Sequence, residues 1–167
     1  MGCSGSGKAE GWLVRDALES DLALLVEFNR QMALETESLV LDPARLAAGV
    51  AAALADPSRG RYLVGERAGQ PAACLMLTTE WSDWRNAWYW WIQSVFVRPD
   101  QRRSGAFREL YGAVLERVRQ SEAVHGVRLY VDADNHAAQA VYAALGMSPS
   151  HYRMFEWELE RGNQPQG

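Results

Sequence analysis

The sequence of 167 residues has few cysteines and histidines and no long apolar segment. Its two cysteines, Cys3 and Cys74, and its three histidines form neither a disulfide framework nor a metal-ligand spacing, so we expect no metal site. No apolar run approaches the roughly 20 residues that cross a bilayer, and the first thirty residues lack the apolar core of a signal peptide. These absences predict a cytoplasmic protein with no membrane partner.

An excess of basic residues is also missing, because the formal net charge is −4. A nucleic-acid partner normally requires a basic face, so this charge argues against one and suits a cationic acceptor better. Seven tryptophans are many for this length, and they suggest an aromatic-lined groove or a heavy core. The length itself fits one domain, which we expect over residues 11–160 between a flexible tail at 1–10 and a polar tail at 161–167.

The amino-terminal residues contain two motif-like patterns. Gly2 to Ala9 nearly spells a phosphate-binding P-loop, but Ala9 replaces the Ser or Thr that would hold magnesium, and no strand precedes the segment. Met1-Gly2 with Ser6 also fits a loose myristoylation pattern. We interpret this stretch as an uninformative tail.

Hydrophobic periodicity and turn residues predict alternating helices and strands. Because both hairpins and a strand-helix-strand crossover are expected, the fold class is α/β, with a three-layer α/β/α arrangement around a mixed sheet. The expected strands are 12–15, 61–66, 71–80, 87–97, 126–132 and 151–159; the expected helices begin near Ser20, after Pro43, near Phe107 and at Asn135.

The strand over 87–97 is unusual because five of its residues are aromatic. Both of its faces are apolar, which predicts a central strand that is covered on each side. Strict alternation assigns its residues to two faces. One face holds Trp88, Trp90, Ile92, Ser94 and Phe96; the other holds Tyr89, Trp91, Gln93, Val95 and Val97.

The turn after this strand, Arg98 to Leu110, has the features of an anion-binding site. Pro99 ends the strand, and Gly105 permits a tight backbone path or the close approach of a ligand. The following helix begins with N–H groups that have no partner inside the helix, and its dipole adds a partial positive charge. Arg102 and Arg103 strengthen the expectation that a phosphate binds here.

A second stretch, Asp132 to Tyr142, leads into the last expected helix. Asn135 can cap that helix through its side-chain oxygen. Ala138 and Tyr142 follow on the helix at i+3 and i+7.

Together, Arg102 to Phe107 and Asn135 to Tyr142 resemble the two motifs of the GNAT superfamily of N-acetyltransferases, in the same order. The resemblance covers roughly residues 12–160 and implies a strongly twisted, mixed, largely antiparallel sheet that is splayed between strands 4 and 5. Acetyl-CoA would lie in the splay as co-substrate, and Tyr142 would protonate the departing thiolate. Phe107 departs from the usual Gly or Ala and would narrow the space beside the cofactor. The implied cofactor-binding residues are Val95, Phe96, Val97, Arg102, Arg103, Ser104, Gly105, Ala106, Phe107, Asn135 and Ala138.

The acceptor site is less well defined. Glu80 ends a predicted strand just before Trp81, where neighbouring aromatic rings would partly desolvate its carboxylate and could hold a cationic amine. We therefore expect Glu80 to receive the acceptor amine, directly or through water, although a Glu exposed on a turn fits equally well. Glu37, Trp81 and Gln93 are the expected substrate-binding residues, and Glu35 is a further candidate.

Two other functions fit parts of the pattern. The first is a GNAT-fold module that binds acyl-CoA without turnover, and the second is an unrelated nucleotide-binding α/β protein. Cys74 is a poor nucleophile because it lies in a predicted buried strand. The acceptor, whether a small amine, an antibiotic or a peptide amino terminus, stays open, as does assembly into a homodimer.

Overall fold

The computed structural model describes residues 11–157 and residue 159. These residues belong to two compact units, of which the first ends at Leu129 and the second begins at Tyr130. The expected tails at 1–10 and 161–167, with Cys3 and the P-loop-like stretch, lie outside the described residues. A single domain over 11–160 therefore stays a prediction.

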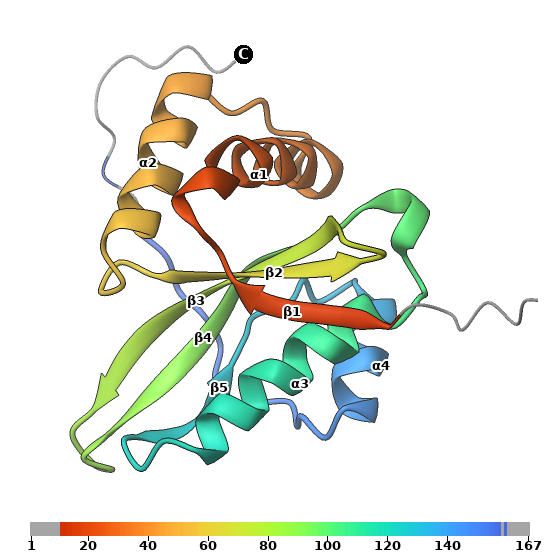
Figure 1. Cartoon of the computed structure of the whole chain (residues 1–167). Helices are drawn as coiled ribbons and strands as arrows, with labels where there is room; N and C mark the ends of the chain where they lie inside the picture. The colour runs from red at the N-terminus through yellow and green to blue at the C-terminus, as the bar shows by residue number, and fades with distance from the viewer. Residues whose placement is uncertain (1–10, 158, 160–167) are drawn as a thin grey trace, which may run out of the picture. The chain divides into compact units, whose positions relative to one another are not determined.

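The first unit contains a five-stranded mixed sheet with the strands in chain order, β1-β2-β3-β4-β5 (Figure 1). The first four strands are antiparallel to their neighbours, and β5 is parallel to β4. The sheet is thus mixed and largely antiparallel, as predicted. The strands are β1 (Trp12–Asp16), β2 (Arg61–Arg67), β3 (Gln70–Ser82), β4 (Ala87–Val97) and β5 (Val124–Arg128).

Helices cover both faces of this sheet, which gives the predicted three layers. The helices α1 (Leu22–Glu37) and α2 (Pro43–Ala55) lie on one face, and α3 (Ala106–Arg119) lies on the other (Figure 1). Two short 3-10 turns, η1 (Glu19–Asp21) and η2 (Pro99–Gln101), precede α1 and α3. No helix in the described part of the chain is both long enough and apolar enough to cross a membrane.

Local sequence signals account for several of these boundaries. The Asp42 side chain accepts a hydrogen bond from the Arg45 N–H at 2.7 Å, and Pro43 occupies the first turn, so α2 begins where its cap and proline require. Ala68 and Gly69 both have positive φ, 52° and 70°, between paired Arg67 and Gln70. Two left-handed residues suit the right-handed twist of a two-residue hairpin, which explains the β2–β3 turn.

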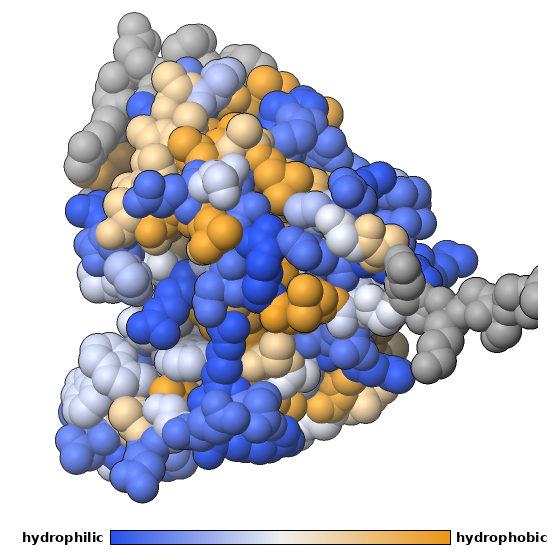
Figure 2. Space-filling view, in the orientation of Figure 1, coloured by the Kyte–Doolittle hydropathy of each residue, from blue (hydrophilic) through white to orange (hydrophobic). Residues whose placement is uncertain are grey.

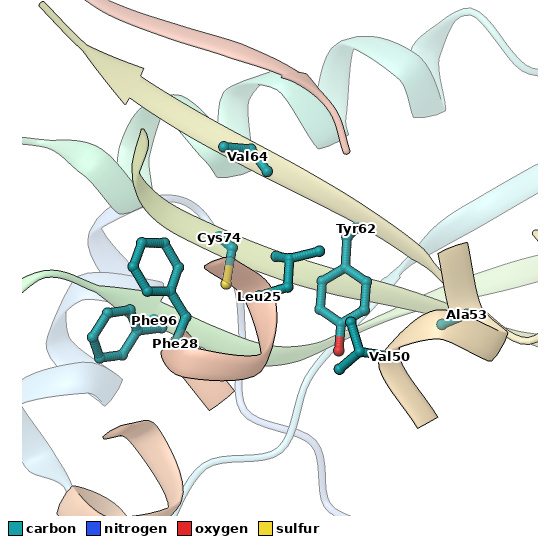
Figure 3. Packing of buried hydrophobic residues seen from close by; sticks show 8 residues of the cluster. All are labelled: Leu25, Phe28, Val50, Ala53, Tyr62, Val64, Cys74 and Phe96. Carbon is teal, nitrogen blue, oxygen red and sulfur yellow. The ribbon is translucent and has the colours of Figure 1, made fainter. Parts of the chain in front are cut away.

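The core on the α1 and α2 side is formed by side chains from five elements. Phe28 and Phe96 lie with ring centroids 4.8 Å apart, close to Cys74 (Figure 3). Full burial of each large apolar side chain contributes about 1.5–3 kcal/mol to folding. The buried cluster comprises Leu25, Phe28, Val50, Ala53, Tyr62, Val64, Cys74 and Phe96.

An extra residue in β4 breaks the alternation that the sequence predicts. Cys74 pairs with Phe96 and Met76 pairs with Gln93, so two steps along β3 match three along β4. Ser94, inside this interval, has φ 48°, as expected for a β-bulge. Strict alternation is therefore wrong beyond Gln93. Phe96 therefore faces the α1 side of the sheet, as Tyr89, Trp91 and Gln93 do. Val95 and Val97 do not face the side that strict alternation assigns to them together with Gln93.

The strands β4 and β5 separate after a short paired segment. Their rungs run from Trp88 with Val124 to Trp91 with Arg128, and the strands splay to edges 17 Å apart. Within the described residues, Ile92–Val97 consequently has no partner strand on its β5 side. This confirms the expected splay between strands 4 and 5.

The end of the chain differs from the prediction in two places. The fifth strand is Val124–Arg128 instead of 126–132, because the chain leaves the sheet once β4 and β5 part. In the second unit, α4 (His136–Ala144) forms as expected, but residues 151–157 and 159 contain no strand. An alternating apolar pattern there has no paired neighbour strand, and an unpaired strand has no hydrogen bonds to hold it.

An ion-pair network joins β1 to the start of α1. Arg15 donates from Nη1 to Asp21 Oδ2 at 2.7 Å and from Nη2 to Oδ1 at 3.0 Å, while its Nε donates to Glu66 at 2.6 Å. The Leu18 N–H also donates to Asp21, which is a buried residue. The Arg15 hydrogen bonds hold the pKa of the Asp21 carboxyl below its ordinary value. The ionised carboxylate therefore stabilises the folded state.

Asp21→Asn should lower the free energy of unfolding by about 2 kcal/mol at pH 7, because it removes a buried charge-assisted pair. Since the folded pKa of Asp21 is depressed, its contribution is complete above about pH 4 and is lost as pH falls through the folded pKa. Urea unfolding of wild type and variant from pH 7 to pH 2.5 should show the difference shrinking in acid. The exposed Glu19→Gln variant in the same turn is the control. A constant difference at every pH would show that the pair does not carry the effect.

Candidate active site

The loop between η2 and α3 has an unusual backbone. Arg103 has φ 62° and Gly105 has φ 89°, so two of three consecutive residues are left-handed immediately before α3 begins at Ala106. A Cβ at position 105 would meet nothing within 4 Å, so the backbone angle and not packing requires glycine there. Such a turn directs successive N–H groups to one side, ahead of the positive end of a helix dipole. The loop is therefore suited to hold an anion.

Side chains brace this loop from three directions. Arg102 donates from Nε to the Val97 carbonyl at 3.1 Å and from Nη2 to Glu35 at the end of α1. The Trp12 indole N–H donates to the Ser104 carbonyl at 3.2 Å. Arg102 and Glu35 thus fix the loop against β4 and α1, a contact that no local pattern in the sequence indicates.

The remaining loop side chains have other surroundings. Ser104 donates its hydroxyl to the Gln101 carbonyl, and Phe107 stacks on Tyr111 at 5.9 Å between ring centroids. Arg103 is exposed, and within residues 11–157 it takes part in no ion pair. Arg103 is therefore the loop cation whose charge is uncompensated.

The edge of β4 that follows the bulge leads directly to this loop. Phe96 is buried in the core and fixes the strand, while the Val97 carbonyl accepts from Arg102. Backbone groups of an unpaired strand edge bind extended amide-containing ligands readily, because the ligand takes the place of a strand. This unpaired edge of β4 includes the residues predicted to bind the cofactor, Val95, Phe96 and Val97.

Polar side chains line the α1 side of β3, β4 and β5 near the splay. Gln93 Nε2 donates to Thr78 Oγ1 at 2.6 Å, and the Trp91 indole N–H donates to Glu80. Arg128 Nη1 donates to the other Glu80 oxygen at 2.8 Å. Glu80 and Gln93 thus lie on one face of the sheet, on either side of the paired residues Thr78 and Trp91.

Other expected acceptor residues lie elsewhere. Trp81 faces the opposite side of the sheet from Glu80 and packs edge-on against Trp88, with centroids 4.9 Å apart. Trp84 is 91% exposed in the turn of the same hairpin, and the end of this hairpin is largely pale and blue in Figure 2. Glu37 is exposed at the end of α1. Of the expected residues Glu80, Trp81, Gln93 and Glu37, Glu80 and Gln93 therefore share this face of the sheet.

An apolar hollow of about 380 Å³ opens on the α1 side of the sheet. Met76 belongs to its wall and pairs with Gln93 across the strands. Sequence reasoning missed the hollow because its walls come from the segment before α2, from α2 itself, and from β2 and β3. They include Leu41, Leu46, Val50, Tyr62 and Met76.

The second unit presents the other predicted motif. Asn135 Oδ1 accepts the Ala138 N–H at 3.0 Å, which confirms its role as the cap of α4. Tyr142 is half-buried on that helix, and burial raises the pKa of its phenol. A phenol is protonated near neutral pH whether or not it is buried, so Tyr142 carries a proton that it can donate.

Two features limit the chemistry of the site. Cys74 is buried, and burial raises the pKa of its thiol to about 12, so almost no thiolate is present near neutral pH. Among the described residues, no three metal-binding side chains cluster closely enough to hold an ion.

Comparisons with known proteins agree with this arrangement. The model of the acetyltransferase (GNAT) family matches residues 24–147. A solved structure of a possible acetyltransferase from Clostridium difficile 630 is 39% identical, with a TM-score of 0.83, over 89% of this chain and 97% of that one. A predicted acetyltransferase from Clostridium acetobutylicum, solved with acetyl-CoA, shares the fold at 16% identity, with a TM-score of 0.72 over 92% of this chain and all of that one.

A curated relative, the mycothiol acetyltransferase of Kocuria rhizophila, is 33% identical over 117 residues. That match covers 57% of this chain and 38% of the relative, so the chain spans well under half of its length.

The loop geometry predicts that a negative charge at position 105 blocks anion binding. Gly105→Asp should weaken CoA binding by at least about tenfold in calorimetry, because a carboxylate would oppose the phosphates at close range. Gly105→Ala adds the backbone strain without the charge, so its affinity for CoA should fall less than that of Gly105→Asp. Gly112→Asp, at an exposed glycine two turns along α3, is the matched control and should bind normally. Equal affinity of folded Gly105→Asp and wild type would remove the loop from the binding site.

Proposed function

Because the chain belongs to the acetyltransferase (GNAT) family, we propose that it transfers an acetyl group from acetyl-CoA to a primary amine by direct attack in a ternary complex. The observation that carries the proposal is the left-handed turn at Arg103 and Gly105, which joins the splayed edge of β4 to the amino terminus of α3. The turn offers donors to a diphosphate, and the edge offers backbone groups to the pantetheine arm.

Within this proposal the cofactor residues have separate roles. The backbone N–H groups of the turn from Arg103 to Phe107 bind the diphosphate, and the Arg103 side chain adds charge. Arg102 acts through its contacts to Val97 and Glu35, so its side chain positions the loop. The acetyl-CoA complex of the Clostridium acetobutylicum protein supports the same ligand for this chain.

The reaction needs two things of the protein, a group that takes a proton from the amine and a group that gives one to the thiolate. The amine nitrogen must be neutral when it attacks the thioester carbonyl; a C–N bond then forms, the C–S bond breaks, and the thiolate needs a proton. Glu80 and Gln93 line the acceptor side, where Glu80 attracts the amine and takes its proton directly or through water. Tyr142 supplies a proton to the thiolate, because a phenol is protonated near neutral pH. Cys74 takes no covalent part, since its thiol is buried and protonated.

Thiol release from acetyl-CoA, followed over a panel of amines, tests the proposal. Release that depends on both protein and amine is the expected result. Binding of acetyl-CoA without release for any amine would instead identify a non-catalytic acyl-CoA-binding module.

Tyr142→Phe keeps the aromatic ring and removes the hydroxyl. Turnover should fall by about 10²–10⁴, the usual range for general acid catalysis, while affinity for acetyl-CoA changes little. Tyr152→Phe, the same change at an exposed tyrosine, should leave both quantities unaltered. A Tyr142→Phe enzyme with normal turnover would show that the thiolate leaves unaided or uses another donor.

A further inference from the structure

The ion pair between Glu80 and Arg128 lies where β4 and β5 begin to part. Arg128 is the last residue of β5, and its partner Trp91 forms the last rung of the β4–β5 ladder. Both side chains are accessible, with 44% of Glu80 and 38% of Arg128 exposed. A charged pair at this point faces the region into which the proposed function brings the acetyl group and the acceptor.

Arg128 is held in place by an aromatic ring. Its Cζ atom lies 3.6 Å from the centroid of Tyr89, and it lies 5.8 Å from the ring of Trp91. Tyr89 can lie flat against β5 because Gly126 is opposite, where a Cβ would come within 3.2 Å of the ring. Arg85 in turn donates to the Tyr89 hydroxyl at 2.8 Å. The guanidinium is therefore oriented by stacking and does not depend on Glu80 alone.

Both charged groups keep hydrogen-bonding capacity. Within the described residues, the guanidinium forms one side-chain hydrogen bond, from Nη1 to Glu80, and an Arg has five N–H donors. Each Glu80 oxygen accepts one bond, from Arg128 or from Trp91, and each has a second lone pair. The pair can accordingly bind a further anion on one side and a further cation on the other.

We infer that the Glu80–Arg128 pair selects amines that also carry a carboxylate, such as free amino acids. This inference rests on the proposed function. In such a complex the ammonium group of the arriving acceptor meets Glu80, and its carboxylate takes a two-pronged contact from Arg128. An amino acid zwitterion adds two contacts between opposite charges, one to Glu80 and one to Arg128, to the existing contact between these two side chains. A polycation without a carboxylate would instead place a second positive charge against Arg128.

A purely structural role for the pair makes a different prediction. A salt bridge that only ties β5 to β3 would affect stability and overall turnover, but it would not distinguish an acceptor with a carboxylate from one without. The test therefore compares matched acceptors on the same enzyme. Free L-amino acids and the corresponding L-amino acid amides differ at the carboxylate and keep the side chain and the amine.

The measurement is kcat/KM from thiol release with acetyl-CoA for each acid and amide pair. Wild type should favour the acids. Arg128→Gln should reduce the acid-to-amide ratio by about tenfold or more, mainly through KM for the acid, because a charge-assisted contact is lost. Arg128→Lys keeps the charge but loses the two-pronged contact and the stacking on Tyr89, so it should retain only part of the ratio. Arg59→Gln, at an exposed arginine that pairs with Asp56, is the matched control and should leave the ratio unchanged.

A binding measurement supplies a second readout. Calorimetric titration of an accepted amino acid into the CoA-bound protein should show affinity lost in Arg128→Gln and kept in Arg59→Gln.

A wild-type enzyme that acetylates amides as well as acids would overturn the inference and leave the proposed function intact. So would an acid-to-amide ratio that is the same in Arg128→Gln as in wild type. Absence of thiol release with every amine, including uncharged ones, would overturn the proposed function as well.

Discussion

The extra residue of β4 at Ser94 is the constraint on which the candidate site depends. It places Phe96 on the same side as Gln93, where Phe28 and the core hold it. The strand beyond the bulge stays paired with β3 but not with β5, so one edge of β4 is left open. Bulges increase the local twist, and increased twist favours the separation of neighbouring strands.

The open edge and the anion-binding turn are parts of one continuous structure. β4 ends at Val97, η2 follows, and the left-handed residues Arg103 and Gly105 turn the chain into α3. Arg102 reinforces the junction by joining the Val97 carbonyl to Glu35 of α1. An exposed ion pair of this kind adds little to stability, so its value lies in the position it gives the loop.

Sequence patterns anticipate the parts of the fold that short-range chemistry determines. Pro43 and Asp42 begin α2, Ala68 and Gly69 form the hairpin, and Gly105 meets a backbone angle that other residues adopt at a cost. The cap formed by Asn135 likewise follows from its own side chain and the N–H three residues later.

The features that sequence patterns missed depend on residues that are far apart in the chain. Alternation along β4 cannot reveal the bulge, because the register depends on where Cys74 and Met76 pair. Trp81 is next to Glu80 in the chain but lies on the other face, while Arg128 comes to Glu80 from 48 residues away. The available signal for this contact was an arginine within the predicted strand 126–132.

The central claim is that one ligand uses both the splayed edge of β4 and the turn before α3. A crystal structure of the protein with CoA tests it most directly. We expect the diphosphate against the backbone from Arg103 to Phe107 and the pantetheine arm along Ile92–Val97. A diphosphate bound away from that turn, or an arm that does not touch β4, would show that the turn and the strand edge do not form one site.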